Sequence, residues 1–245
     1  TVAWLRKVFP NTEFDYVNAG IGATNSQFGA ARVQEDLLCR LPDLVMVEFS
    51  VNDHCTPHDM ETYEGLIRQI YGSRSCPAMV LLHSVYYDTG KSAAYYHAQI
   101  GRHYDLPCIS MQNSIYPAVA AGRLPAEKIT ADFLHPNDLG HEFMVAVIMN
   151  FLEKVIHDKT EEQQEIFPAP LTENAYEHCA RLQYFNSTPE KSGFEEDMTP
   201  QRGITDIFRN GWSAGEKGAY LEFAFRGTGA AVQYRRVKDG PAPIA

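Results

Sequence analysis

Asp132 and His135 form an Asp-x-x-His string directly before a long amphipathic segment. A carboxylate three residues ahead of a histidine can accept the imidazole Nδ1–H. That contact fixes the tautomer and leaves Nε2 facing outward as a general base. The alternative is an acidic residue leading into a helix beside a half-buried histidine, because such a pair often arises by chance. The continuation Pro-Asn-Asp-Leu-Gly-His is an unusual string and favours the catalytic interpretation.

Asn52 follows an apolar run that is typical of a buried strand. Residues 44–49 read Leu-Val-Met-Val-Glu-Phe, and Ser-Val-Asn-Asp comes directly after them. An asparagine at a strand end can direct its amide NH₂ into a cleft as a hydrogen-bond donor to an oxyanion. Taken in isolation, an Asn-Asp turn that closes the strand is the more common explanation.

A glycine-containing turn follows another strand-like run, in the string Asn-Ala-Gly-Ile-Gly-Ala-Thr-Asn-Ser over residues 18–26. Gly20 and Gly22 allow the backbone to turn sharply into a helix, whose first N–H groups are free to stabilise an anion. An ordinary strand–turn–helix connection explains this segment more often than a site does.

Strands and helices alternate through residues 1–157. We expect strands at 16–21, 44–49, 79–83 and 107–110, and helices at 2–9, 26–41, 59–71 (with Asp59 as N-cap), 93–104 and 136–156. This alternation predicts an α/β fold, a three-layer doubly wound parallel sheet with helices on both faces. The polar segments above then lie at the carboxyl ends of strands, where open α/β sheets place their sites.

The pattern changes after residue 157. Residues 158–170 are acidic and polar and end in prolines, which indicates a linker. In residues 171–245, apolar and polar side chains alternate from Tyr220 to Arg226, a glycine turn follows at 227–229, and the alternation resumes at 231–235. We therefore predict a domain over 1–157, a linker over 158–170, and a partial antiparallel β-sandwich, jelly-roll-like, over 171–245.

The order of glycine turn, strand-end asparagine and late Asp-x-x-His resembles the SGNH/GDSL hydrolase family. The matching strings are Asn-Ala-Gly-Ile-Gly-Ala-Thr from residue 18, Ser-Val-Asn-Asp from residue 50 and Asp-Phe-Leu-His from residue 132. The resemblance implies a serine esterase in which His135 is the base and Asp132 orients it. It further implies that Asn52 donates its side-chain amide to the oxyanion.

Two positions depart from the pattern of that family. The backbone oxyanion donor is usually a glycine, and the aligned position here is Ala23, or Gly22 if the register shifts by one. An alanine still offers its N–H, although a side chain limits the accessible φ. The asparagine string usually begins with glycine, where this chain has Ser50.

The nucleophilic serine of the family belongs to a Gly-Asp-Ser string that does not occur in residues 1–245. We expect this serine upstream of residue 1, and we expect residues 1–245 alone to be inactive. Ser26 fits a helix start, Ser50 fits the asparagine string, and Ser84 fits the end of a strand. Nothing in the spacing brings Cys55 to His135 as a replacement nucleophile.

Two further groups of residues have possible roles. His54 and His58 have the spacing of metal ligands, but Pro57 interrupts a helix between them and no third ligand is evident. We therefore predict no metal and no cofactor. The string from Tyr86 to Asp88 follows a predicted strand, where it either lines the mouth of a pocket or packs within a loop.

Composition narrows the range of partners and compartments. The net charge of -10, with no Lys/Arg-rich stripe to offset it, argues against nucleic-acid binding. The sequence contains no run of about 18 apolar residues, so we expect no membrane span. The five cysteines are scattered without a CxxC pair, which favours reduced thiols and a cytoplasmic location, although an upstream signal peptide stays possible.

A β-sandwich appended to an SGNH domain resembles the arrangement of microbial carbohydrate acetylesterases. This resemblance implies O-deacetylation of a saccharide or small ester through an acyl-enzyme. Lipid or thioester hydrolysis on the same fold is one alternative. A non-catalytic carbohydrate-binding protein that lacks the nucleophile is another. The oligomeric state is open.

Overall fold

The computed structural model describes residues 1–158 and 167–235 and divides into two compact units. The first unit comprises Thr1–Ala19 and Thr24–Cys179. The second comprises the short segment Gly20–Ala23 and the chain from Ala180 onward.

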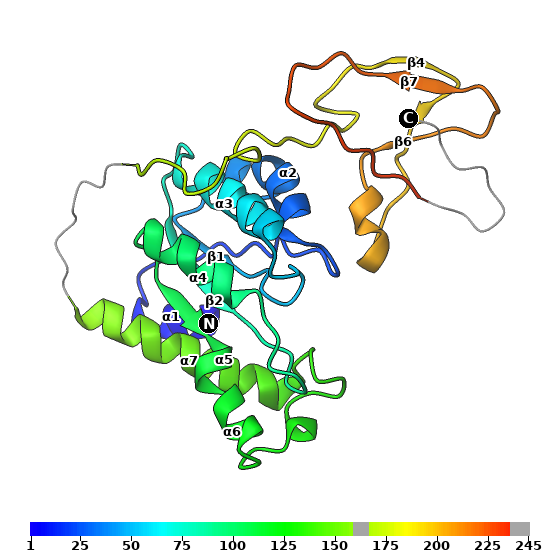
Figure 1. Ribbon diagram of the computed structural model, residues 1–245. Helices are drawn as coiled ribbons and strands as arrows, with labels where there is room; N and C mark the ends of the chain where they lie inside the picture. Colours follow the sequence, from blue (N-terminus) through cyan, green and yellow to red (C-terminus); the bar gives the residue numbers. More distant parts are fainter. Residues whose placement is uncertain (159–166, 236–245) are drawn as a thin grey trace. The chain divides into compact units, whose positions relative to one another are not determined.

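The first unit is built around a parallel sheet. Its strands, in spatial order, are β1 (Leu44–Val47), β2 (Ala78–His83) and β3 (Cys108–Ser110). Its helices are α1 (Val2–Val8), α2 (Ser26–Asp36), η1 (Leu38–Arg40), α3 (Pro57–Tyr71), α4 (Ala94–His103), α5 (Met111–Ser114), α6 (Tyr116–Ala120), η2 (Ala126–Lys128) and α7 (Asp138–His157). Helices α2 and α3 lie on one side of the sheet, and α1 and α7 lie on the other (Figure 1).

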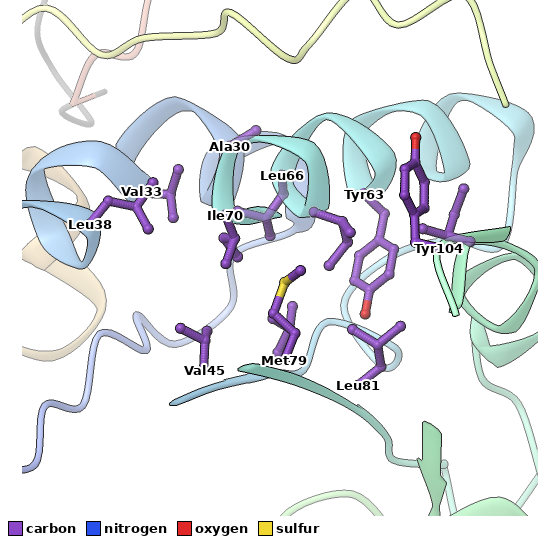
Figure 2. Packing of buried hydrophobic residues seen from close by; sticks show 13 residues of the cluster. Ala30, Val33, Leu38, Val45, Tyr63, Leu66, Ile70, Met79, Leu81 and Tyr104 are labelled. Atoms are coloured by element: carbon purple, nitrogen blue, oxygen red, sulfur yellow. The ribbon is translucent and has the colours of Figure 1, made fainter. Parts of the chain in front are cut away.

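Each face of the sheet buries its own apolar cluster. On one face, Val45, Met79 and Leu81 pack against side chains of α2, α3 and α4 (Figure 2). On the opposite face, Val80 and Ile109 pack against side chains of α5 and α7. Successive residues of a strand point to opposite faces, so a strand covered on both sides must be apolar throughout. The α/β class with helices on both faces, predicted from the sequence, is confirmed.

Polar side chains fix the starts of the helices that follow the strand-end loops. Asn25 caps α2 by accepting the N–H of Phe28, and Asn137 caps α7 by accepting the N–H of Gly140. The prediction of Asp59 as the cap of α3 is wrong. Thr56 is the N-cap and accepts the N–H of Asp59, because a proline at the first helical position moves the helix start earlier.

Residues 16–21, predicted to form a strand, have no regular structure. A strand is stable only when its N–H and C=O groups pair with a neighbour. In the part of the chain that the structure describes, β1, β2 and β3 pair only with one another. Among the described residues, no strand pairs with this segment.

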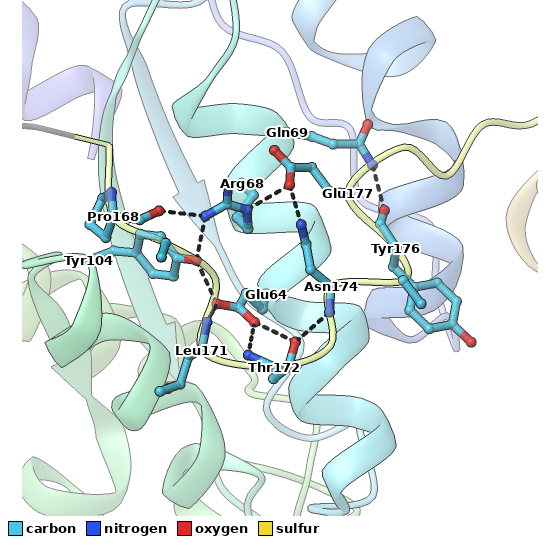
Figure 3. Close-up of polar contacts among 12 residues, drawn as sticks. Glu64, Arg68, Gln69, Tyr104, Pro168, Leu171, Thr172, Asn174, Tyr176 and Glu177 are labelled. Carbon is cyan, nitrogen blue, oxygen red and sulfur yellow. Dashed lines mark hydrogen bonds and ion pairs between the residues drawn. The ribbon is translucent and has the colours of Figure 1, made fainter. Parts of the chain in front are cut away.

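Residues 167–179 form a segment of the first unit that packs against α3, and we call it the strap (Figure 3). Glu64 of α3 accepts the N–H groups of Leu171 and Thr172 at 2.6 and 2.8 Å. Arg68 donates to the carbonyl of Pro168 and to the Glu177 carboxylate, both at 2.8 Å.

These contacts place the boundary of the first unit after Cys179 rather than at residue 170. Residues 159–166 of the predicted linker lie outside the described residues.

The second unit contains short antiparallel pairs. Strand β4 (Glu190–Ser192) pairs with β7 (Tyr220–Glu222), and β5 (Glu195–Glu196) pairs with β6 (Trp212–Ser213). A 3₁₀ helix, η3 (Gly203–Phe208), lies between them in sequence. The alternating pattern at 231–235 forms no strand, and residues 236–245 lie outside the described residues. A β-sandwich consists of two packed antiparallel sheets, and these two short antiparallel pairs supply only a small part of one.

No helix in the described ranges is long and apolar enough to cross a membrane.

Candidate active site

The carboxylate of Asp132 and the imidazole of His135 are in direct contact. Oδ2 of Asp132 lies 2.6 Å from Nδ1 of His135, as the three-residue spacing predicts. Oδ1 of the same carboxylate accepts the backbone N–H of His135 at 2.8 Å and that of Leu134 at 3.1 Å. Both carboxylate oxygens of Asp132 therefore accept hydrogen bonds, and these bonds fix the orientation of the His135 ring.

Hydrogen bonds hold Asp132 in its charged form. The imidazole of His135, and then the backbone N–H groups of His135 and Leu134, lower the pKa of the Asp132 carboxyl far below its ordinary value. An anionic acceptor requires the proton on Nδ1, so Nε2 of His135 carries the lone pair. Within the described residues nothing hydrogen-bonds to Nε2, and the His135 side chain is 79% exposed.

The loop that carries this pair is anchored at both sides. Phe133 adopts a left-handed conformation, with φ of +64°, and its carbonyl accepts the N–H of Tyr87 at 2.8 Å. Thr130 and Pro136 form an isolated antiparallel bridge that closes the loop just before α7. A non-glycine residue with positive φ is uncommon and persists only when the surrounding contacts require it.

Asn52 lies in a tight turn five residues beyond β1. Its N–H donates to the carbonyl of Phe49 at 3.0 Å. The side chain is half-buried, and no group in the described ranges hydrogen-bonds to its amide. The amide NH₂ is thus available as a donor to an incoming oxyanion.

The loop after β2 contacts both of these segments. The hydroxyl of Tyr86 donates to the carbonyl of Val51 at 3.2 Å, beside Asn52. The next residue, Tyr87, is buried and donates its N–H to Phe133, beside His135. The aromatic string at 86–88 therefore has a packing role, which links the asparagine turn to the Asp-His loop.

Gly22 and Ala23 form a turn with distinct backbone geometry. Ala23 has φ of +58°, a left-handed conformation that an alanine adopts at a cost and a glycine adopts freely. The segment Gly20–Ala23 groups with the second compact unit. The oxyanion role of the Gly22 and Ala23 N–H groups stays a prediction.

The internal hydroxyls near the strand ends have structural partners. Ser26 is buried and its Oγ lies 2.7 Å from Oγ1 of Thr62. Ser50 is also buried and donates to Glu48 at 2.6 Å. Within the described part of the chain, His135 has no hydrogen bond to the hydroxyl of Ser26, Ser50 or Ser84. It has none to the thiol of Cys55 either.

Pro57 separates the two histidines that have metal-ligand spacing. His54 precedes α3 and is exposed, whereas His58 lies in the first turn of that helix. Nε2 of His58 is 3.2 Å from the side-chain oxygen of Gln27. Among the described residues there is no group of three or more His, Cys, Asp or Glu side chains that could hold a metal ion.

Asp53 and His97 were not identified from the sequence as part of this region. Oδ2 of Asp53 lies 2.9 Å from Nε2 of His97, and both side chains are fully buried. The two residues are 44 positions apart. The only local signal was an acidic residue next to Asn52, and that signal is equally consistent with a turn.

The fold and the Asp-His geometry agree with a family assignment. The GDSL-like Lipase/Acylhydrolase family matches residues 1–143, which includes Asn52, Asp132 and His135. The chain belongs to this family. The resemblance read from the three strings is thereby confirmed.

Two solved structures resemble the chain over most of its length. One is a two-domain esterase (CEX) active on acetylated mannans, with 50% identity, a TM-score of 0.82, and coverage of 89% of this chain and 59% of that chain. The other is the same kind of esterase co-crystallized with mannopentaose, with 51% identity, a TM-score of 0.80, and coverage of 89% and 58%. This chain thus spans about three fifths of the length of those esterases. A search of curated proteins found no match.

Proposed function

We propose that the protein is a serine carboxylic ester hydrolase that removes O-acetyl groups from a mannan-type polysaccharide. The observation that carries the proposal is the 2.6 Å contact between Asp132 and Nδ1 of His135. Among the described residues this contact leaves Nε2 of an exposed imidazole without a hydrogen-bond partner, so that it can accept a proton.

His135 acts twice in the proposed reaction. A serine outside residues 1–245 gives its proton to Nε2 as its Oγ bonds to the acetyl carbon. The imidazolium returns that proton to the sugar oxygen as the ester C–O bond breaks, and an acetyl-enzyme remains. Water then transfers a proton to Nε2 and attacks the acetyl carbon. Acetate leaves, and the serine regains its proton from His135.

Asp132 and Asn52 stabilise the charges that develop in this cycle. The carboxylate of Asp132 keeps Nδ1 protonated and stabilises the transient imidazolium. The side-chain amide of Asn52 donates to the oxygen of the tetrahedral intermediate, together with the backbone N–H of Ala23 or Gly22. Removal of one such donor typically lowers kcat by about 10²–10³-fold.

The substrate class rests on the solved relatives. Esterases that share 50–51% of residues with this chain, over 89% of its length, act on acetylated mannans. The short antiparallel pairs that follow Cys179 are consistent with an additional module beside the catalytic unit. Lipid and thioester hydrolysis are the competing activities.

Acetate release from acetylated glucomannan by the full-length protein tests the proposal. We expect turnover that is lost in His135→Ala and is much faster than hydrolysis of p-nitrophenyl palmitate or palmitoyl-CoA. Preference for the long-chain ester or the thioester would contradict the substrate class. Absence of all three activities would support a non-catalytic carbohydrate-binding protein.

A further inference from the structure

A buried carboxylate lies directly beside the proposed oxyanion donor. Asp53 follows Asn52 in the turn after β1, and its side chain has no exposed surface. Oδ1 of Asp53 accepts the backbone N–H of Ser26, at the start of α2, at 2.8 Å. Oδ2 accepts from Nε2 of His97, in α4, at 2.9 Å. A buried carboxylate is costly to desolvate without such bonds, so both contacts hold it strongly.

His97 is a rigid partner for this carboxylate. Its ring stacks on the ring of Tyr63, with centroids 3.6 Å apart and planes at 6°. Tyr63 belongs to the apolar cluster between α3 and the sheet (Figure 2). Nδ1 of His97 is buried and has no partner in the described residues, so the ring proton is on Nε2, where it is donated to Asp53.

The turn couples Asp53 to Asn52 through a shared acceptor. The N–H groups of both residues donate to the carbonyl of Phe49, at 2.9 Å for Asp53 and 3.0 Å for Asn52. One carbonyl therefore fixes two consecutive residues. A displacement of Asp53 moves the backbone that carries the Asn52 amide.

We infer that Asp53 is a positioning residue, which aims the Asn52 amide by joining the asparagine turn to α2 and to α4. The inference rests on the proposed function, in which Asn52 is an oxyanion donor. Asp53 touches no substrate and acts through its neighbour. Its partners come from two different helices, so the turn is held on two sides rather than by a single cap.

The size of the effect follows from the geometry that oxyanion stabilisation requires. A donor misplaced by about 1 Å can cost about 10²-fold in rate. The loss belongs to the transition state, so kcat should fall while KM stays nearly constant. A purely structural residue would lower the melting temperature without this split between kcat and KM.

A double-mutant cycle on the full-length protein tests the inference, with p-nitrophenyl acetate as substrate. Asp53→Asn keeps one oxygen as acceptor for the Ser26 N–H but presents an amide to His97. We expect kcat to fall about 10–100-fold, with KM within about threefold of wild type. Asn52→Ala should lower kcat by about 10²–10³-fold. The double variant should fall no further than Asn52→Ala, because Asp53 then has no donor to position.

The possible outcomes separate this inference from the proposed function. If Asn52→Ala lowers kcat but Asp53→Asn does not, or if the two losses multiply, the positioning role of Asp53 is wrong and the esterase assignment stands. If Asn52→Ala leaves kcat unchanged, the oxyanion role of Asn52 is wrong, and the positioning role falls with it. Loss of activity in His135→Ala then still reports on the esterase assignment independently.

A second variant and a control guard against misfolding. His97→Gln keeps a donor toward Asp53, so we expect its kcat to stay within about tenfold of wild type and above that of Asp53→Asn. Thr62→Val removes the hydrogen bond to the Ser26 hydroxyl, in the same buried region, without touching Asp53. It should lower the melting temperature and leave kcat unchanged. An equal loss of kcat in Thr62→Val would show a general packing effect and overturn the inference.

Discussion

Nδ1 of His135 lies 2.6 Å from Oδ2 of Asp132, and Oδ1 of the same carboxylate accepts the backbone N–H of His135 at 2.8 Å. One carboxylate thus binds both the ring and the backbone of the same histidine. This double contact fixes the tautomer and the direction of the ring even though the His135 side chain is largely exposed. The geometry explains how a short loop can hold an exposed histidine in one orientation.

Asp132→Asn should leave the fold intact and nearly abolish turnover. An amide no longer requires the proton on Nδ1, so the imidazole adopts the wrong tautomer for accepting a proton at Nε2. A loss of about 10³–10⁴-fold in kcat is expected from the equivalent change in other serine hydrolases. Steady-state hydrolysis of p-nitrophenyl acetate measures it. Asp138→Asn, in the exposed first turn of α7, is the matched control and should retain wild-type kcat.

Tyr86→Phe should weaken the contact between the loop after β2 and the turn that carries Asn52. The substitution removes only the hydroxyl that donates to the Val51 carbonyl at 3.2 Å. The bond contributes about 1 kcal/mol, so a fall of about fivefold in kcat is expected if the Asn52 turn loosens. Tyr95→Phe, at an exposed position 68% accessible, should change nothing. Equal kinetics in the two variants would show that Tyr86 does not position the turn.

Glu64→Gln should loosen the strap over residues 167–179. Glu64 accepts from Leu171, Thr172 and Tyr104, and the glutamine amide replaces one of its two acceptor oxygens with a donor. We expect amide hydrogen exchange at Leu171 and Thr172 to accelerate by about tenfold or more at pH 7. Glu61→Gln is the control, because Glu61 is half-buried and, among the described residues, accepts from the backbone N–H of Ala175 in the same strap. Unchanged exchange in Glu64→Gln would contradict the role given to this carboxylate.

The strap should also depend on pH. Burial alone would raise the pKa of Glu64, but hydrogen bonds from Thr172, Tyr104 and Leu171 outweigh it and lower the pKa below its ordinary value. A carboxyl with a lowered folded-state pKa contributes stability above its unfolded value, about 4.3, and loses it as pH falls through the folded pKa. Exchange at Thr172, corrected for its intrinsic rate, should therefore be slow at pH 7 and approach that of Glu64→Gln in acid.

His83 should make the first unit less stable in mild acid. Burial, and then the electrostatic effect of the neighbouring His97 ring, lower the pKa of His83 to about 4. Between pH 4 and its unfolded value of about 6.5, the unfolded chain binds the extra proton, so the free energy of unfolding rises with pH. The whole shift corresponds to about 3 kcal/mol. Urea unfolding at several pH values should show this rise in wild type and lose it in His83→Leu. His157→Gln, an exposed control on α7, should keep the wild-type slope.

Local sequence patterns predicted the elements that depend on neighbours close in the chain. Four residues of the predicted run at 44–49 form β1 (Leu44–Val47), and the Asp-x-x-His spacing gives the expected contact, because both depend on residues within one element or loop. The strand expected at 16–21 did not form, since a strand is completed only by a partner that lies elsewhere in the sequence. The cap of α3 moved from Asp59 to Thr56 because two plausible caps lie within one turn.

The contacts that hold the Asn52 turn could not be predicted from the sequence. Asp53 meets Ser26 and His97, which lie 27 and 44 residues away and come from separate helices. Nothing in the local string distinguishes a buried carboxylate from an exposed turn residue. The same holds for Glu64, whose partners at 171 and 172 lie more than 100 positions further on. Tertiary packing, rather than periodicity, decides these contacts.

Covalent labelling of the full-length protein with a fluorophosphonate tests the central claim most directly. Digestion and mass spectrometry would locate the modified residue in wild type and in His135→Ala. The account predicts a single modified serine outside residues 1–245, with labelling strongly reduced in His135→Ala. Labelling of Ser26, Ser50 or Ser84, or labelling that does not depend on His135, would contradict it.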